Sequence, residues 1–294
     1  MDWIAREGIR FSNCVTNSPV CVPTRLSLAT GHYPHNTGVW DNQNHTLRGD
    51  AATWMQAVRN AGYRTSLFGK THLHPHGGDL RHREHLMNAY GLDDVDEIGG
   101  PRASARCLSY MTAMWEEKGK WKAYQDDFDE RFANKPHVVR ASTHDFEDYA
   151  DVYVGQQAKS YLENYDRSEP WFCWVSFGGP HEPWDTPEPY FSRYNPDDMP
   201  DPAPVPESRP DRPQGTLDRR TRVDFEPGEE KLLRANYAGN VTLIDDQMGE
   251  IFEAIEARGE LDNTVIVHMS DHGEMNGDCG LIYKSNFICV YKSF

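Results

Sequence analysis

The sequence lacks an apolar run long enough to cross a membrane, and its first residues, MDWIAREGIRF, are too charged for a signal peptide. We therefore expect no membrane partner, while the cellular compartment stays undecided. The chain is also poor in positive charge, since 30 Lys and Arg stand against 46 Asp and Glu, giving a formal net charge of −16. Because neutralising phosphates requires clustered cations, we expect no nucleic-acid partner.

Cysteine is sparse as well, with six residues in 294 and no CxxC spacing. This pattern excludes a disulfide scaffold and indicates no obvious zinc site, although one or two bridges remain open. What the chain does have is 38% hydrophobic and 12% aromatic residues. That content is sufficient for one large core and argues against disorder.

Helical and apolar extended segments alternate along the chain. Helices are predicted over residues 52–61, 146–164 and about 227–258, the last from an apolar stripe at spacings of three and four. Apolar strands are predicted over the second half of 3–15, after a helix end, and over 63–70, 169–179 and 264–273. This alternation predicts an α/β fold, a sandwich with a largely parallel central sheet flanked by helices.

Two stretches interrupt the alternation. Residues 74–145 show weak periodicity, which predicts an irregular insertion with loops and a helix around 108–118. Residues 195–213 contain seven prolines, which predicts an extended surface loop. We treat residues 1–294 as a single domain that carries both features.

Polar residues follow three of the predicted strands, at 70–72, 179–181 and 271–272. In parallel α/β sheets, ligands gather at the carboxyl ends of the strands. The sequence therefore predicts one shared site at that edge of the sheet.

The run CVPTRLSLATG places Cys21 at or just before a helix, because Pro23 suits a first helical turn. A helix N-terminus favours an anion, although a cysteine is more often a small buried apolar residue. The order of Cys21, Pro23 and Arg25, followed by TGHYPHNTGV, resembles the formylglycine-dependent sulfatases of the alkaline phosphatase-like superfamily. The resemblance covers roughly residues 3–287.

The resemblance implies that a separate formylglycine-generating enzyme oxidises Cys21, whose hydrated aldehyde then acts as the nucleophile. Arg25 would stabilise the hydrate and its charge. Lys70 and His72 of GKTHL would bind sulfate oxygens and the aldehyde-derived hydroxyl, and lie on one face of an extended segment.

Two further residues complete the implied sulfate site. His181 of GGPHEPW would bind sulfate and protonate the leaving alcohol, a role that suits a side chain titrating near neutrality. Lys284 matches the second sulfate-binding lysine of the family. Together with Arg25 and Lys70, Lys284 would form the local cationic cluster that the overall charge does not suggest.

The resemblance also implies a metal site, with calcium as the expected ion and Asp271, His272 and the modified Cys21 as ligands. The pattern departs from the family at three points. The family's first strand, which ends in two metal-binding aspartates, is absent, Cys279 stands where histidine is usual, and the C-terminal subdomain is lacking. Calcium requires six or more oxygens, and we expect the chain to be a fragment of a longer enzyme.

A rival metal site would use His72, His74 and His76, since imidazoles suit transition metals. Proline at position 75 and the lack of a neighbouring carboxylate or thiol argue against it.

We therefore expect a sulfuric ester hydrolase of the arylsulfatase type that cleaves a small-molecule or saccharide sulfate ester. A phosphonate monoester or phosphodiester hydrolase of the same superfamily is the close alternative. A truncated remnant without activity is the third possibility, because the aspartate-bearing strand is absent.

Overall fold

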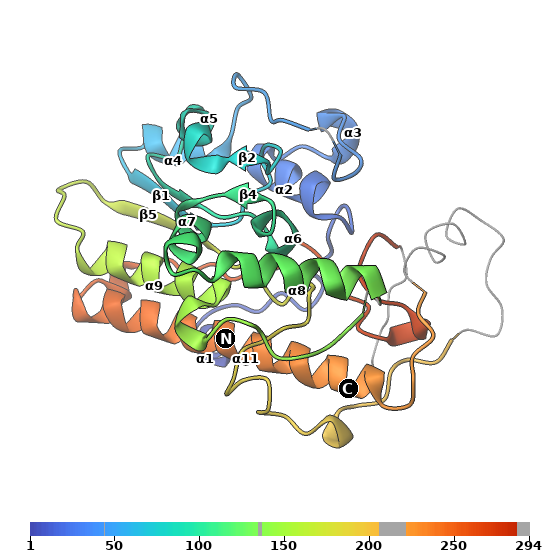
Figure 1. Ribbon diagram of the computed structural model, residues 1–294. Coiled ribbons are helices and arrows are strands. Elements are labelled where there is room, and N and C mark those ends of the chain that lie inside the picture. The colour runs from blue at the N-terminus through green and yellow to red at the C-terminus, as the bar shows by residue number, and fades with distance from the viewer. Residues whose placement is uncertain (44, 135–136, 206–221, 287–294) are drawn as a thin grey trace.

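The computed structural model describes all residues except 44, 135–136, 206–221 and 287–294. Its centre is a parallel sheet in the order β3–β1–β5, formed by Asp94–Glu97, Arg64–Gly69 and Trp171–Ser176 respectively. β1 pairs Gly69 with Glu97 on one side and with Ser176 on the other. This parallel sheet, flanked by helices, confirms the predicted α/β fold (Figure 1).

Alternating side chains on the central strands divide the core between the two faces of the sheet. Leu67 and Trp174 pack on one face with α2 (Cys21–Thr30), α4 (Trp54–Asn60) and α5 (Glu84–Ala89). Phe68 and Val175 pack on the other face with α7 (Tyr110–Glu117), α8 (Trp121–Asn134), α9 (Ala150–Glu163) and α11 (Glu229–Ala257). The two helical layers lie above and below the sheet in Figure 1.

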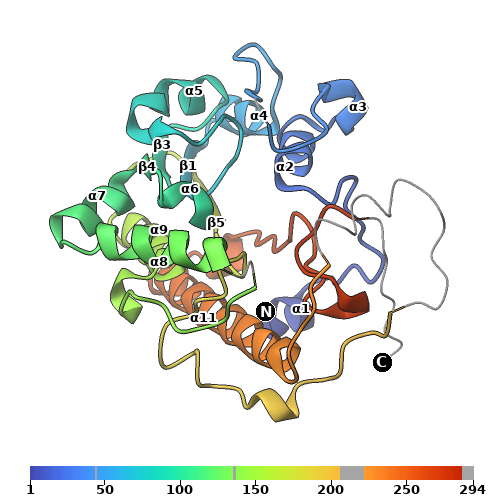
Figure 2. The same cartoon turned by 45° about the vertical axis from the view of Figure 1, so that its right-hand side comes forward.

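The longest helix, α11, was predicted from its apolar stripe and is confirmed with close to the expected bounds. Ile244, Met248, Ile251 and Ile255 of that stripe are buried. The helix runs beside α9, and the short α1 (Asp2–Glu7) lies against it (Figure 2). No helix among the described residues is both long enough and apolar enough to span a bilayer.

The segment at 74–145 is more regular than we predicted. The helix expected around 108–118 is confirmed as α7, but the segment also contains α5, α8 and β3, a strand of the central sheet. Its smaller elements are β2 (Gly78–Asp79), η1 (Leu80–Arg83), α6 (Pro101–Ser104) and β4 (Cys107–Leu108). Most of these span two to eight residues, too few for a sequence period to emerge.

Two predicted strands are wrong. Residues 8–15 and 264–270 form no strand, and Val265 and Val267 are 89% and 78% exposed. A strand exists only where its backbone groups pair with a neighbour, and no strand among the described residues pairs with either segment. Apolar composition alone was therefore insufficient to predict a strand.

In the described part of the proline-rich stretch, residues 195–205 form a loop with one turn, η3 (Pro196–Asp198). Residues 206–213 of the predicted loop lie outside the described residues. The remaining short elements are α3 (Pro34–Thr37), η2 (Phe146–Asp148), η4 (Leu261–Asn263) and η5 (Asp278–Gly280).

Candidate active site

The site forms at the carboxyl ends of β1 and β5. The Lys70 backbone N–H donates to the Ser176 carbonyl at 2.9 Å, which extends the pairing one residue beyond β1. Gly69 has a φ of +112°, and a Cβ there would lie 2.0 Å from the Ser176 oxygen. Only glycine fits this crossing, which fixes where Lys70 leaves the sheet.

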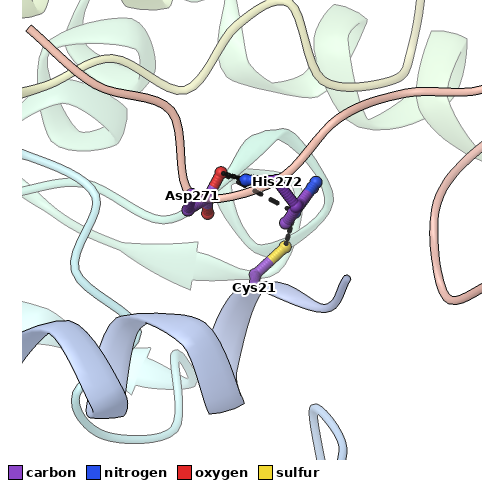
Figure 3. A group of neighbouring side chains, drawn as sticks. All are labelled: Cys21, Asp271 and His272. Carbon is purple, nitrogen blue, oxygen red and sulfur yellow. Dashed lines mark hydrogen bonds and ion pairs between the residues drawn. The ribbon is translucent and has the colours of Figure 1, made fainter. Parts of the chain in front are cut away.

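Cys21 is the first residue of α2 and only 1% exposed. The residue before it, Val20, offers no side-chain cap, and Asn42 Oδ1 accepts from the Val22 N–H at 3.0 Å. The positive end of the helix dipole lies at Cys21. Its Sγ lies 3.0 Å from Nε2 of His272 (Figure 3). The cysteine therefore occupies an anion-favouring position, as the sequence predicted.

The hydrogen bond on the far side of His272 fixes which of its ring nitrogens carries a proton. Nδ1 lies 2.9 Å from the Gly273 carbonyl, which can only accept, so Nδ1 carries a proton. In the neutral ring Nε2 then accepts a hydrogen bond from the Cys21 thiol, and in the charged ring it donates one to the thiolate. Burial alone would lower the pKa of His272, but its hydrogen bond to Cys21 raises that pKa.

The surroundings of Cys21 favour an anion. Burial would raise the pKa of the thiol, but the charge of Lys70 and hydrogen bonds with His181, His272 and His72 lower that pKa well below its ordinary value. Three segments distant in sequence thus converge on one sulfur atom.

Arg25 connects the cysteine helix to the rest of the site. Its Nε donates to Asp271 Oδ2 at 2.7 Å. Its Nη1 donates to the Lys70 carbonyl at 2.6 Å and to Ser176 Oγ at 3.0 Å. These contacts make Arg25 a positioning residue for the loops that carry Asp271 and Lys70.

Lys284, His181 and Glu182 form a second hydrogen-bonded group. Nζ of Lys284 lies 2.6 Å from His181 Nε2 and 3.1 Å from Glu182 Oε2. His181 Nδ1 lies 2.8 Å from the Glu182 carbonyl, so its proton is on Nδ1 and Nε2 accepts from the lysine. Burial lowers the pKa of His181, which favours the neutral ring.

Glu182 sets the charge of this group. Its Oε1 also lies 2.7 Å from Nη2 of Arg102. Burial would raise the pKa of Glu182, but its interactions with the His181 ring and with the charges of Lys284 and Arg102 lower it to about 2. For Lys284 the two effects are reversed, because burial would lower its pKa and the Glu182 carboxylate raises it.

All the predicted site residues lie in this one region. The segment that leads to Asp271 and His272 differs from our prediction. Asp271 and His272 follow an unpaired segment rather than a strand. Arg25 was expected to act on residue 21, and its hydrogen bonds are to Asp271 and Lys70. Lys284 sits between Tyr283 and Ser285, both at positive φ, a conformation common at functional sites.

Sequence reasoning missed two polar residues of the site. Glu182 lies within GGPHEPW, and its position next to His181 was the available signal. Ser176 had no local signal, because its contact with Arg25 depends on the register between β1 and β5.

The expected calcium ion can be tested against the donors present. The atoms of Cys21, Asp271 and His272 lie within 4.8 Å of one another and comprise a thiol, a carboxylate and an imidazole. Both Asp271 oxygens already accept, from Arg25 Nε and from the His272 N–H. Calcium requires six to eight oxygens, so these donors alone do not fit calcium, and their sulfur and nitrogen suit a transition metal better.

Comparison with known proteins gives an independent view. A family model described as Sulfatase matches residues 1–286. An arylsulfatase of Clostridium perfringens is 27% identical over 282 residues, covering 95% of this chain and 58% of the relative. The multifunctional alkaline phosphatase superfamily protein PehA of Trinickia caryophylli is 28% identical over 319 residues, covering 98% of this chain and 59% of the relative.

A solved structure supports the fold. The phosphonate monoester hydrolase of Agrobacterium radiobacter superposes with a TM-score of 0.67 at 22% identity, over 93% of this chain and 57% of that one. The chain thus spans less than two thirds of the length of each of these proteins.

Proposed function

The chain belongs to the sulfatase family, and on that premise we propose that it carries the reactive site of a sulfuric ester hydrolase. Members of this family use a formylglycine and a divalent metal ion. One observation supports the proposal most strongly: the buried Cys21 at the N-terminus of α2, with Lys70 lowering the pKa of its thiol. The substrate would be a sulfate monoester of a small molecule or a saccharide.

Cys21 is the residue we propose for conversion to formylglycine, with a formylglycine-generating enzyme as its maturation partner. As a hydrated aldehyde, residue 21 would offer one hydroxyl for attack on sulfur and a second whose deprotonation restores the aldehyde and releases sulfate. The place fits this group, because His272 and the nearby Lys70, His72 and His181 offer polar partners for two oxygens.

Lys70 and Lys284 supply positive charge for the sulfate oxygens. Lys70 is only 2% exposed, and burial lowers its pKa. An anion beside the ammonium group would therefore stabilise its charged form. Lys284 keeps its charge because Glu182 raises its pKa. The two ammonium groups would stabilise charge that develops on the transferring sulfuryl group.

The leaving alcohol requires a proton, which His181 and Lys284 can supply as a pair. His181 Nε2 accepts from the lysine ammonium, so a proton is held 2.6 Å away on Nζ. As the S–O bond to the alcohol breaks, that proton can pass to the leaving oxygen directly or through Nε2. The Nδ1–H bond to the Glu182 carbonyl holds the ring in place.

We propose Asp271 and His272, with residue 21, as ligands of the family's divalent ion. For calcium, oxygen ligands beyond this set would be required, since Asp271 is the only carboxylate of the set.

Phosphonate monoester or phosphodiester hydrolysis is the second candidate. The relative PehA is described as multifunctional, and lysines that hold a sulfate also attract a phosphoryl group. A remnant without turnover is the third, because the donors of Cys21, Asp271 and His272 alone do not fit calcium.

The test begins with peptide mass spectrometry across Cys21, on the chain co-expressed with a formylglycine-generating enzyme. We expect a loss of about 18 mass units, as the thiol is replaced by an aldehyde. Hydrolysis of an aryl sulfate is then compared with that of an aryl phosphodiester, with Cys21→Ala as the control. An unmodified thiol would favour the remnant, and faster phosphodiester turnover would favour the second candidate.

A further inference from the structure

A second group of possible metal ligands lies outside the reactive site. His74 and His76 follow β1, and Glu97 is the last residue of β3. His74 Nε2 lies 2.7 Å from Glu97 Oε2, and His76 Nε2 lies 3.0 Å from Glu97 Oε1. The three side chains are between 0% and 3% exposed. One ligand atom from each of the three residues lies within 4.8 Å of the other two.

The protons of His74 are constrained by its neighbours. Its Nδ1 lies 3.0 Å from the Pro75 carbonyl, which can only accept, so Nδ1 carries a proton. In the neutral ring, Nε2 then presents a lone pair to a Glu97 oxygen that also presents a lone pair. Two facing lone pairs require a cation between them, either a second proton or a metal ion.

His76 faces a conflict of the same kind. Its Nε2 receives the His72 backbone N–H at 3.3 Å, which requires a lone pair, yet it also lies 3.0 Å from Glu97 Oε1. Its Nδ1 is buried, with no hydrogen-bond partner among the described residues. A single proton on Nε2 would satisfy Glu97 but not the His72 N–H. A metal ion would use the Nε2 lone pair and bind the carboxylate, and it would replace the long 3.3 Å contact with the His72 N–H.

We propose that His74, His76 and Glu97 bind a divalent transition-metal ion, for which zinc is the best match. Two imidazoles and one carboxylate form a known zinc ligand set, with water in the fourth position. Tetrahedral zinc would separate its ligand atoms by about 3.3 Å. The present separations of 2.7 and 3.0 Å are close enough that small side-chain rotations would admit the ion.

The surrounding contacts match those of a metal site. Metal-bound histidines commonly donate their other N–H to a backbone carbonyl, as His74 does to Pro75. The hydroxyl of Thr71 donates to Glu97, which orients the carboxylate. The objection raised from sequence, a missing carboxylate, does not hold, because the fold brings Glu97 beside both histidines.

The ion would connect the loop after β1 to the end of β3. This loop carries Lys70 and His72, and the His72 ring lies 4.6 Å from that of His76. Binding would therefore restrict the backbone that carries two residues of the reactive site. The metal would position these residues and would not contact the substrate.

The test measures zinc stoichiometry in a Cys21→Ala background, which removes the thiol that could bind zinc at the reactive site. Each protein is stripped with chelator, incubated with zinc chloride, desalted and analysed by inductively coupled plasma mass spectrometry. We expect one zinc per chain in the background protein and loss of that zinc in His74→Gln and Glu97→Gln. His82→Gln, an exposed histidine of the same region, should retain the zinc.

A second measurement does not depend on the folding of the glutamine variants. The folded background protein is titrated with Co²⁺, and tetrahedral nitrogen and oxygen coordination should produce visible absorption bands. The proposal is overturned if the folded background protein binds neither zinc nor cobalt. It is equally overturned if folded His74→Gln and Glu97→Gln keep the zinc, because the ion would then lie elsewhere.

Discussion

Glu182 controls the charge of the proposed sulfate site through Lys284. Its carboxylate raises the pKa of a lysine whose burial would otherwise lower it. In Glu182→Gln the pKa of Lys284 should fall, and the lysine should lose its proton at a lower pH. Because the charged form binds sulfate and protonates the alcohol, we expect the alkaline limb of the kcat/KM profile to move to lower pH. Activity near neutrality should fall about tenfold to a hundredfold in the aryl sulfate assay.

The matched control is Glu163→Gln, at an exposed position near the end of α9, which should keep the original profile. An unchanged alkaline limb in folded Glu182→Gln would mean that the carboxylate does not set the protonation of Lys284. The role proposed for the Lys284 and His181 pair would then be incorrect.

The reactive residues were predictable where their signals were local. Cys21, Pro23 and Arg25 lie within five positions, and the spacing alone suggests a helix start. Glu97 was not predictable, because it lies 21 residues beyond His76 and meets it only through the pairing of β3 with β1. Partners brought together by sheet register leave no trace in local sequence.

At the scale of the elements, the crossing of β1 and β5 depends on Gly69. A methyl group in Gly69→Ala would meet the Ser176 oxygen at 2.0 Å, at a φ of +112°. Since backbone must move to admit it, we expect a loss of about 2–4 kcal/mol in the free energy of unfolding. Urea unfolding followed by circular dichroism measures this change.

Gly62→Ala separates the two causes, because Gly62 has a φ of +96°, close to that of Gly69, but no neighbour within 4 Å of its Cβ position. We expect it to lose only about 1 kcal/mol. Equal losses in the two variants would show that conformation rather than the approach to Ser176 accounts for the effect.

The elements predicted correctly are those with long or strongly apolar patterns, such as α9, α11, β1 and β5. β3 was missed because its sequence, DVDE, is acidic and only four residues long. The apolar composition of residues 264–270 predicted a strand. A segment forms a strand only if another strand lies beside it to accept its hydrogen bonds, and local composition does not show this. The order of helices and strands was thus easier to predict than which strands pair.

At the scale of the whole molecule, apolar side chains are exposed on two segments that form neither helix nor strand, residues 264–270 and 8–15. Val265, Val267 and Met269 of the first are 89%, 78% and 55% exposed. Phe11 and Val15 of the second are 77% and 84% exposed. Backbone without a partner, carrying apolar side chains, is prone to pair with another chain.

We therefore expect the chain to self-associate through residues 264–270, and Val265→Thr/Val267→Thr to weaken that association. Replacing two exposed isopropyl groups reduces the apolar area available for burial, so the concentration at half association should rise about tenfold, equivalent to about 1.4 kcal/mol. Light scattering after size-exclusion chromatography over a range of concentrations measures this midpoint. Trp40→Thr, which removes an apolar side chain that is 66% exposed outside both segments, should leave the midpoint unchanged. The prediction is wrong if the unchanged chain and both variants stay monomeric at every concentration. Val265 and Val267, which are 89% and 78% exposed, would then remain in water without driving association.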